Sequence, residues 1–485
     1  MIDPEYRLAI VRPNASNIFM QNKPTHHSGP ATRREFIKKT ATVAAALAAA
    51  PLLRPTIYGQ APSTGKVLGA NDRINVAFIG VGGQGMNAHV NISSKNAAAN
   101  NISQVAVCDV WSKRTTAAKA FIEKAGTGAN VTTHIDYREI LDRKDIDAVV
   151  IATHDPIHAA ASIGAMESGK HVYCEKPLTR YLGEAFAVHD VVKKTGKILQ
   201  VGSQGTSAAA WHKAAAMITA GEIGQLVWAQ GYYCRNNPKG EWNYPIDTEA
   251  TAATVDWEKW LGPVKKRPAK FDPQHFFRWR KFYPYCAGLL GDLMPHRLHP
   301  LMLAMGKQEF PTRVMSIGTK NVGTDKKFQD AYERDVPEHV ELLAEFPSGV
   351  SLMLACSTVN SRSPGFALYG HHATLEVGSS GERIELKPER EFADEIEPAT
   401  IDGLKPTEDI GAHHANWFDC IRSGKQPNCG IDLAVRVQTV ITLAEMSDRL
   451  GVACYFDEKT RKVSTGIGKE RREITPLTYG TLELS

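Results

Sequence analysis

Three residues in this sequence are of types that move a proton to and from a hydroxyl group. Lys176 follows Glu175 directly, and Asp292 stands four residues before His296. A lysine can donate a hydrogen bond to an oxygen that gains or loses a proton, and its pKa falls readily on burial or near other cations. A histidine can accept the proton itself. The alternative for Lys176 is an ordinary Lys–Glu pair at the surface.

Asp292 and His296 lie on one face if residues 292–296 are helical, because residues four apart are neighbours on a helix. Pro295 must then lie in the first turn, where its missing N–H is tolerated. In this arrangement the carboxylate orients the imidazole or accepts a hydrogen bond from the substrate. The imidazole takes a hydroxyl proton as hydride leaves the same carbon. The alternative is a helix-capping aspartate and a core histidine.

A glycine-rich turn follows a short β-rich run, Asn75–Ile79, and precedes a stretch compatible with a helix, Met86–Ser93. A glycine at each of three positions would permit a tight turn, a close approach of backbone to a pyrophosphate, and close packing of helix on strand. The motif alone also fits an ordinary turn, but its position after a strand favours dinucleotide binding. The predicted cofactor-binding residues in this turn are Gly80, Gly82, Gly83, Gln84 and Gly85.

A second β-rich run, Gln104–Cys108, ends at Asp109. This is the place of the acid that hydrogen-bonds the adenosine ribose in dinucleotide-binding folds. A carboxylate there repels a 2′-phosphate, so we expect NAD as the cofactor, while Lys113 and Arg114 nearby keep NADP possible. The alternative for Asp109 is to cap a helix over residues 111–125.

Strand and helix patterns alternate from residue 70 to about residue 205. Predicted helices cover residues 111–125, 137–141 and 157–168, and predicted strands cover 147–152, 171–174 and 197–202. Such alternation predicts a Rossmann fold, a doubly wound parallel sheet of the α/β class. Residues after its strands lie at the ligand-binding edge, where we expect Thr153, His158, Glu175 and Lys176 to bind cofactor. A packing role for His158, and for His154, is equally open.

The pattern changes after residue 206. Six β runs follow, and a helix over residues 432–450 lies near the end of the chain; the β runs are 225–234, 313–320, 338–346, 350–358, 373–377 and 383–387. An aromatic and basic loop, residues 276–285, precedes Asp292. Its Arg278, Trp279 and Arg280 either line a pocket for a polyhydroxylated ligand or pack the loop against the sheet.

The segment Gly169-Lys-His-Val-Tyr-Cys-Glu-Lys-Pro-Leu178, the glycine turn and Asp292-Leu-Met-Pro-His296 together resemble the Gfo/Idh/MocA family of sugar and inositol oxidoreductases. The resemblance runs from about Asn71 to the end of the chain. It implies a Rossmann domain over residues 70–205 and a C-terminal α/β domain over residues 206–485. The second domain would carry an open, largely antiparallel sheet that floors the substrate pocket and mediates a homo-oligomer, a dimer or tetramer. The final helices are free to pack back on the first domain.

The same resemblance implies an NAD(P)-dependent oxidoreductase acting on CH–OH groups, with Lys176, His296 and Asp292 as catalytic residues. The alternative is an NAD-dependent glycoside hydrolase that oxidises a sugar carbon transiently, eliminates the aglycone and reduces the carbon again. A non-catalytic sugar-binding protein is a third possibility, against which the intact catalytic residues argue. Two departures, His299 where the family has Asp and Gly205-Thr-Ser207 where many members have Arg, lie where specificity is set. The particular sugar is therefore not implied.

Residues 1–60 resemble a leader. Arg33-Arg34, Phe36 and two lysines precede an Ala-rich apolar stretch, residues 40–53, a pattern typical of a twin-arginine signal. The stretch is shorter than the roughly 20 residues that cross a bilayer. A basic amphipathic helix is the alternative, but the stretch has no polar face. We therefore expect the twin-arginine export machinery as a partner and a periplasmic or other extracytoplasmic location, with the cofactor loaded before export and retained.

Charge and cysteine placement limit other functions. The formal net charge is +5, and the first 60 residues account for it with eight Lys or Arg against three acids. The rest of the chain is balanced, which argues against nucleic acid as a partner. The eight cysteines are scattered without metal-ligand spacing and are typical of core thiols, although one or two bridges stay open. His413 and His414 lack a third ligand at usable spacing, so no metal site is predicted.

Overall fold

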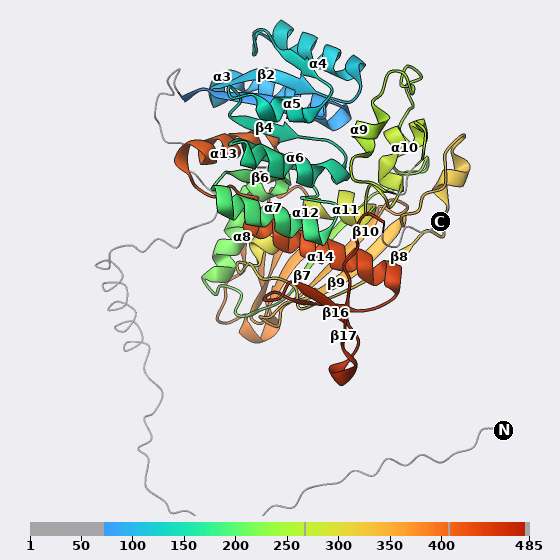
Figure 1. The fold of residues 1–485 in the computed structure, drawn as a ribbon. Coiled ribbons are helices and arrows are strands. Elements are labelled where there is room, and N and C mark those ends of the chain that lie inside the picture. The colour runs from blue at the N-terminus through green and yellow to red at the C-terminus, as the bar shows by residue number, and fades with distance from the viewer. Residues whose placement is uncertain (1–71, 266–267, 406–407, 481–485) are drawn as a thin grey trace, which may run out of the picture. The chain divides into compact units, whose positions relative to one another are not determined.

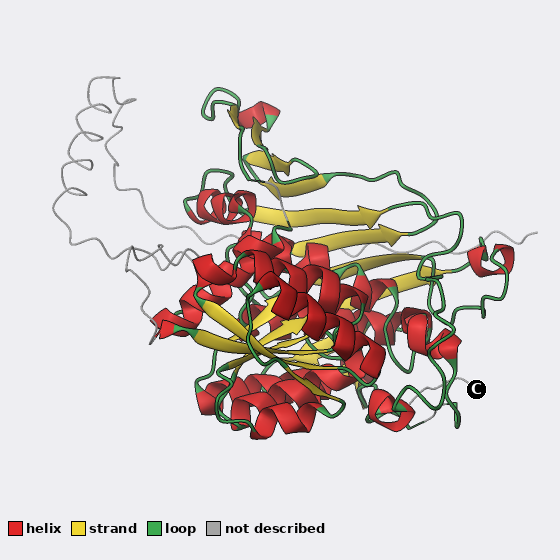
Figure 2. Ribbon diagram, turned by 90° about the horizontal axis from the view of Figure 1, so that it is seen from above, coloured by secondary structure: helices red, strands yellow, loops and turns green. Residues whose placement is uncertain are grey.

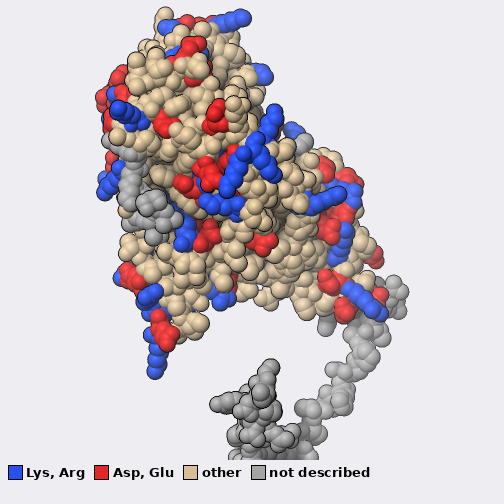
Figure 3. Space-filling model, turned by 90° about the vertical axis from the view of Figure 1, so that its right-hand side faces the viewer, with Lys and Arg blue, Asp and Glu red and all other residues tan. Residues whose placement is uncertain are grey.

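The computed structural model describes residues 72–265, 268–405 and 408–480. The predicted twin-arginine signal lies outside these residues, which Figure 1 draws in colour. Among the helices described, none is long and apolar enough to cross a membrane. All eight cysteines are free thiols, and all but Cys234 are buried. Basic and acidic side chains are interspersed over the face shown in Figure 3.

The first sheet has six strands, all parallel, in the order β3-β2-β1-β4-β5-β6. Its strands are β1 Ile74–Ile79, β2 Ile102–Cys108, β3 Thr132–His134, β4 Ala148–Ile151, β5 His171–Glu175 and β6 Leu199–Gly202. This order is that of the doubly wound Rossmann fold, in which ligands bind beyond the carboxyl ends of the strands where the order reverses. The reversal here lies between β1 and β4. The predicted α/β class is confirmed.

Helices cover both faces of this sheet, as a parallel sheet requires. They are η2 Gly85–Val90, α2 Asn91–Lys95, α3 Ala97–Asn100, α4 Ser112–Ala125, α5 Tyr137–Asp142, α6 Asp155–Glu167 and α7 Leu182–Thr195. Ala77 and Ile79 of β1 pack in the same cluster as α6 and α7, whereas Val76 and Phe78 face α4. The predicted helix after the glycine turn begins with a turn of π-helix, η2, before it becomes α-helical.

The second sheet has eleven strands, in the order β14-β13-β12-β11-β7-β10-β9-β8-β15-β16-β17. Only β7 and β10 pair in parallel; all the other neighbours are antiparallel. The strands are β7 Leu226–Cys234, β8 Arg313–Thr319, β9 His339–Glu345, β10 Ser351–Ser357, β11 Phe366–Gly370, β12 Ala373–Val377, β13 Ile384–Pro388, β14 Ala399–Ile401, β15 Cys454–Asp457, β16 Lys462–Thr465 and β17 Arg472–Ile474. The open, largely antiparallel sheet implied by the resemblance is confirmed.

Of the helices in the C-terminal part, α12 Pro295–Ala304 and α14 Ile431–Leu450 lie between the two sheets, on one face of the larger one (Figures 1 and 2). The other helices of this part are η3 Gln204–Ser207, α8 Ala209–Thr219, α9 Trp257–Leu261, α10 Pro273–Phe277, η4 Trp279–Lys281, α11 Leu289–Asp292, η5 Thr324–Lys327, η6 Arg390–Phe392, α13 Ile410–Ser423 and η7 Gly468–Glu470. Helix α12 contacts β7, and α14 contacts both β8 and α7. Residues of β8 alternate between buried and exposed, so its other face is open.

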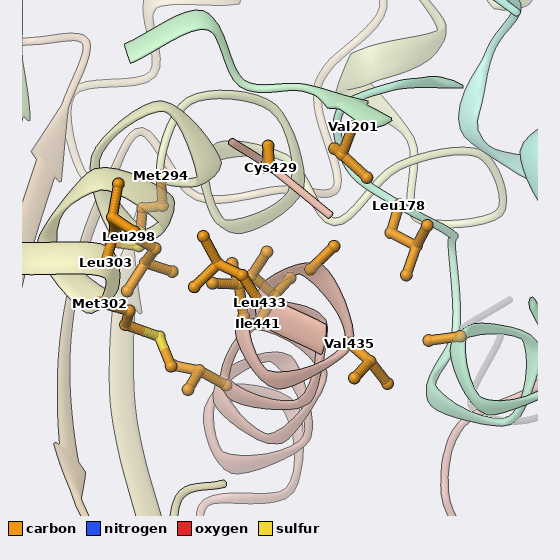
Figure 4. Packing of buried hydrophobic residues seen from close by; sticks show 14 of the residues in the cluster. Leu178, Val201, Met294, Leu298, Met302, Leu303, Cys429, Leu433, Val435 and Ile441 are labelled. Carbon is orange, nitrogen blue, oxygen red and sulfur yellow. The ribbon is translucent and has the colours of Figure 1, made fainter. Parts of the chain in front are cut away.

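One hydrophobic cluster joins the two sheets. Figure 4 shows Leu433 and Ile441 of α14 between Leu178, just after β5, and Val201 of β6 on one side and Leu298 of α12 on the other. All five side chains are at most 2% exposed. Because close-packed interiors transmit displacement rather than absorb it, this cluster holds the end of β5 and the start of α12 in fixed register.

Helix α13 belongs to the C-terminal part of the sequence but packs on the first sheet. Its Trp417 and Phe418 are buried in the cluster that contains Val76 and Phe78 of β1. Arg422, at the end of the helix, donates a hydrogen bond to the Asn100 carbonyl. The first sheet therefore has one face completed by residues more than two hundred positions further along the chain.

Candidate active site

A cavity of about 1110 Å³ lies beyond the carboxyl ends of β1, β2, β4 and β5. It runs from the glycine turn and Asp109 to Lys176, and residues of the second domain complete its wall. Among the predicted site residues, those that line it are Gly80, Gly82, Gly83, Gln84, Asp109, Thr153, Glu175, Lys176, Asp292 and His296. Residues far apart in the sequence thus meet in one space.

The four glycines of the turn serve two purposes. Gly80 has φ +83°, and a Cβ there would lie 2.8 Å from the backbone of Ala152; a Cβ on Gly85 would lie 1.9 Å from the Gly80 carbonyl oxygen. These two glycines are required by the fold itself. A Cβ on Gly83 would meet nothing within 4 Å, and one on Gly82 would approach only the Arg114 guanidinium, at 3.2 Å. Gly82 and Gly83 therefore present bare backbone to the cavity, which is what a closely held pyrophosphate needs.

Asp109 ties the glycine turn to the end of β2. Its carboxylate accepts hydrogen bonds from the Val81 N–H at 3.0 Å and the Trp111 N–H at 3.1 Å, and Arg114 lies 3.6 Å away. Burial raises the pKa of Asp109, although Arg114 and the two amides oppose this rise. Helix α4 has Trp111 as its N-cap residue, so Asp109 does not cap that helix. Its carboxylate lines the cavity and can still accept from a ribose hydroxyl, because each oxygen has a second lone pair.

Thr153 and His154 line the cavity, but His158 lies behind its wall. His158 Nδ1 lies 2.8 Å from the Pro177 carbonyl and Nε2 lies 3.3 Å from the Thr153 carbonyl; the neutral ring has one N–H and donates to one of the two. Burial lowers its pKa and keeps it neutral. We had expected His158 at the cofactor; in the structure it holds the turn after Lys176 instead. His154 stacks on Trp260, with ring centroids 4.2 Å apart.

Glu175 is the centre of a buried polar chain that the sequence did not reveal. Its carboxylate accepts from His89 at 2.9 Å, Gln84 at 3.2 Å and Gln204 at 3.3 Å. Burial alone would raise the pKa of Glu175, but His89, Lys176 and Gln84 together hold that pKa well below its ordinary value. His89 in turn lies 3.0 Å from His414 of α13. These hydrogen bonds fix the side chain of Glu175, the residue next to Lys176.

His413 and His414, considered for metal binding from the sequence, have other partners. His413 hydrogen-bonds the Ser207 hydroxyl at 2.6 Å and the Val201 carbonyl at 2.9 Å. Within residues 72–265, 268–405 and 408–480, no group of three or more His, Cys, Asp or Glu side chains is placed to hold a metal ion. The two histidines instead join α13 to the first sheet.

Lys176 and Asp292 form a buried ion pair. The Lys176 ammonium donates to Asp292 Oδ1 at 2.5 Å and to the Asp292 carbonyl at 2.8 Å. Burial lowers the pKa of Lys176, but the carboxylate of Asp292 outweighs it, so that pKa lies above its ordinary value. The sequence had suggested a lowered pKa, and this expectation was wrong. Lys176 is a charged donor at neutral pH.

Asp292 is fully engaged by cations and an indole. Its Oδ1 also accepts from Arg280 Nε at 2.8 Å, and its Oδ2 accepts from Trp242 Nε1 at 2.9 Å. Burial would raise the pKa of Asp292, but Arg280 and Lys176 lower it far more. The carboxylate therefore stays ionised and orients Lys176.

His296 does not share a helix with Asp292. Helix α11 ends at Asp292, and α12 begins at Pro295, which occupies its first position as the sequence required. The expectation that Asp292 orients the His296 ring is therefore corrected: the carboxylate nearest to His296 Nδ1 is that of Glu408, at 3.6 Å. Burial and the charge of Lys176 lower the pKa of His296 to about 4. The ring is neutral at neutral pH and can accept a proton.

Of the residues in the aromatic loop 276–285, some line the cavity and one packs the loop. Trp279 and Arg280 line the cavity. Arg278 is buried and donates to Gln274 and to the Tyr244 carbonyl, so it packs the loop. The cavity wall also contains Tyr233, Arg235, Tyr244 and Trp260. The sequence did not assign these side chains to the site: Tyr233 lies on β7, Trp260 on α9, and Arg235 and Tyr244 in the segment between these two elements.

Comparisons with known proteins agree with this geometry. Residues 74–203 match the Gfo/Idh/MocA family, described as "Oxidoreductase family, NAD-binding Rossmann fold". The matched residues contain the first sheet and its helices, which are thus an NAD-binding Rossmann domain similar to that of this oxidoreductase family.

Three known proteins illustrate the likeness. The chain is 41% identical over 97 residues to the scyllo-inositol 2-dehydrogenase (NAD(+)) of Bacillus subtilis, 20% of this chain and 28% of that protein. It is 33% identical over 176 residues to a glycosyl hydrolase family 109 protein of Shewanella, 34% of this chain and 38% of that protein. It spans less than half the length of both. The structure of a levoglucosan dehydrogenase in complex with NADH and levoglucosan superposes with a TM-score of 0.59 at 19% identity, over 79% of this chain and 98% of that one.

Proposed function

We propose that this protein is an NAD-dependent oxidoreductase that transfers hydride between a CH–OH carbon of a sugar- or polyol-like substrate and the nicotinamide ring. The observation that carries the proposal is the single cavity that joins the bare backbone of Gly82 and Gly83 to a neutral His296 and a charged Lys176. The similarity to an inositol dehydrogenase supports the substrate class. NAD, when bound, supplies the hydride acceptor.

The side chains divide the proton chemistry between them. His296 is neutral and takes the hydroxyl proton as the C–H hydride leaves the same carbon. Lys176 stays charged and donates a hydrogen bond to the substrate oxygen as it becomes a carbonyl. Asp292 holds the ammonium in place and keeps it protonated, since its own pKa is held low. In the reverse direction His296 returns the proton and Lys176 stabilises the developing alkoxide.

The test is a panel of sugars, polyols and glycosides supplied to the purified protein, with NADH formation followed spectroscopically. Oxidation of at least one polyhydroxylated substrate is expected. If the protein binds NAD but transfers hydride to or from no member of the panel, the proposal fails.

A second function is favoured by the similarity to a glycosyl hydrolase family 109 protein. In this alternative the protein oxidises a sugar carbon transiently, eliminates the aglycone to leave a double bond next to the ketone, adds water across that bond and returns the hydride. The same residues would remove and return the protons. Release of aglycone from a glycoside, with no net change in reduced cofactor, distinguishes it from a dehydrogenase.

We also propose that the protein is exported by the twin-arginine pathway and retains its cofactor. The leader pattern of residues 32–53 supports export. Outside the cytoplasm no free NAD pool is replenished, so a retained cofactor must be restored within each cycle, by a second sugar or keto-sugar or by the hydrolytic route. Near-stoichiometric NAD(H) released from denatured protein, purified without added nucleotide, is the expected result. Protein that purifies empty and accumulates free NADH from added NAD contradicts retention.

Finally, we propose a homo-oligomer, a dimer or tetramer. The open face of the larger sheet supports it, since Met315 and Ile317 of β8 and Leu343 of β9 are 49%, 72% and 55% exposed. Exposed apolar side chains gathered on one face are typical of protein interfaces. Light scattering on the purified protein measures its oligomeric state, and a monomer at micromolar concentration rules out the proposed homo-oligomer.

A further inference from the structure

His296 needs a partner at Nδ1 if Nε2 is to accept a proton. An imidazole has one N–H when neutral, and the group bound to one nitrogen decides which nitrogen carries that proton. Asp292 is not that group: its carboxylate contacts Lys176, Arg280 and Trp242, whereas the carboxylate within 4 Å of His296 Nδ1 is that of Glu408. Within the described residues, His296 Nδ1 is buried and makes no hydrogen bond in the present geometry.

Glu408 is the carboxylate that faces this nitrogen. Its Oε1 lies 3.6 Å from His296 Nδ1 and 3.0 Å from Arg297 Nη1. The side chain is about one-third exposed, whereas His296 is mostly covered. Glu408 has φ +69°, a left-handed conformation that is unfavourable for a residue with a side chain. Such strain persists where the surroundings over-determine a residue's position, and it is common at functional sites.

We propose that Glu408 is the positioning residue for His296: its carboxylate accepts the Nδ1–H, leaves Nε2 free to take the substrate hydroxyl proton, and stabilises the imidazolium that forms. The inference rests on the proposed oxidoreductase function. A separation of 3.6 Å suits this role, because such hydrogen bonds are often long in the ligand-free enzyme and tighten when substrate binds.

The position of Glu408 is set by the start of α13. Asp409, the next residue, caps the helix by accepting from the Ala412 N–H at 2.9 Å. Helix α13 is in turn anchored on the first sheet by Trp417 and Phe418. Arg297 Nη1 contacts the same oxygen, Oε1, that faces His296, and its guanidinium lies over the Tyr233 ring, 4.8 Å from its centroid. The Glu408 carboxylate thus faces His296 of α12 from the start of a helix that packs on the first sheet.

The charges around His296 make the contribution of Glu408 measurable. The charged and titratable groups facing it are Lys176, Glu175, Asp292, Arg297, Tyr233 and Glu408. Burial and Lys176 lower the pKa of His296; Glu408 is the largest contribution in the opposite direction, ahead of Asp292 and Glu175. Removing the Glu408 charge must therefore lower that pKa further.

The first experiment is Glu408→Gln, with Asp402→Asn as the matched control on the same loop. Asp402 is 71% exposed. We expect kcat to fall by about 10- to 100-fold, the cost seen when a partner that orients a metal-ligating histidine is removed, with little change in KM. The acidic limb of the pH profile should move to lower pH, because the base becomes weaker. Asp402→Asn should match wild type.

Two further variants separate positioning from a structural role. In a His296→Ala background Glu408→Gln should have no additional effect on kcat, since the pair is already broken. Arg297→Gln should leave the pH profile in place, because it frees the Glu408 carboxylate for His296. If Glu408→Gln lowers kcat equally in the His296→Ala background, or if Arg297→Gln reproduces its full effect, the positioning role is overturned.

A readout independent of activity keeps the test separate from the proposed function. Histidine labelled at Cε1, with the His296 signal assigned by its loss in His296→Ala, gives the His296 pKa directly by NMR. A lower pKa in Glu408→Gln than in wild type supports the inference; an unchanged value overturns it. Absence of hydride transfer in wild type would count against the proposed function alone.

Discussion

The two ends of the cavity are built in opposite ways. The cofactor end is made of backbone: Gly80, Gly82 and Gly83 in one turn, fastened by Asp109 at the end of the next strand. The catalytic end is made of side chains from separate segments of the chain, from Lys176 after β5 to Glu408 before α13. The first end works through shape and is local in sequence. The second works through charge and exists only when both sheets are assembled.

The largest expected effect belongs to the catalytic end. Lys176→Ala and His296→Ala should each lower kcat by roughly 100-fold or more, the usual effect of losing a positioned proton donor or acceptor. NAD should still bind, because the glycine turn is untouched. Steady-state kinetics measures the loss of kcat, and a fluorescence titration with NADH measures whether the cofactor still binds. Near-normal kcat in either variant would remove that residue from the mechanism.

The second expected effect is acid sensitivity, which should arise at the catalytic end. His296, His299 and His413 are buried, and burial lowers each pKa to about 4 from an ordinary value of 6.5. The folded protein then binds fewer protons than the unfolded chain between pH 6.5 and 4. The contribution of these histidines to the free energy of unfolding is therefore greatest above pH 6.5 and is lost as pH falls towards 4.

Each net proton taken up on unfolding changes the unfolding free energy by about 1.4 kcal/mol per pH unit. Asp155 and Glu184 oppose part of the trend, since burial raises each pKa to about 7. Thermal unfolding measured from pH 8 to pH 4 should show Tm falling below pH 6.5. His299→Asn removes one titrating group and should reduce the slope; a Tm independent of pH in this window contradicts the account.

The third effect tests the backbone character of the cofactor end. Gly82→Ala adds a methyl group that faces only the tip of Arg114, whereas Gly85→Ala places one 1.9 Å from a backbone oxygen. Gly82→Ala should leave Tm nearly unchanged and weaken NAD by roughly tenfold or more, since each ~1.4 kcal/mol of lost binding is tenfold. Gly85→Ala should lower Tm. Equal effects of both variants on Tm would contradict the division between the two glycines.

The smallest effect concerns cofactor choice. Asp109→Ser removes the ribose acceptor and the charge that repels a 2′-phosphate, so NAD should weaken and its advantage over NADP should narrow. Arg114, 3.6 Å away, becomes available to the phosphate. Dissociation constants of wild type and variant for NAD and NADP give the preference of each protein for NAD over NADP. Wild-type protein that prefers NADP would show the ribose assignment of Asp109 to be wrong.

The same contrast explains what could be predicted from sequence. The strands at 102–108 and 171–175 and the turn at 80–85 were visible because a local apolar run and local glycines specify them. β3 was missed because its Thr-Thr-His sequence is polar and largely exposed. β14 to β17 were missed because they are three or four residues long and depend on a neighbouring edge.

The site divides in the same way. Lys176, Asp292 and His296 were found from residue type and spacing, yet their partners Arg280, Trp242 and Glu408 were not assigned. These contacts join positions 12 to 116 residues apart, and the Asp292 carboxylate beside Lys176 reverses the direction that the sequence suggested for the pKa of Lys176. The four-residue spacing predicted that Asp292 orients His296. In the structure α11 ends at Asp292 and α12 begins at Pro295, and the Asp292 carboxylate pairs with Lys176 instead.

The place of α13 on the first sheet has a consequence for biosynthesis. β6 ends at residue 202 and α13 begins at residue 410, so at 5–20 residues per second roughly 10–40 s separate their emergence from the ribosome. During that interval Val76 and Phe78 of β1 lack Trp417 and Phe418. The nascent chain thus carries an incomplete apolar face through most of its synthesis, a surface on which a chaperone can act and at which a prematurely terminated chain would aggregate.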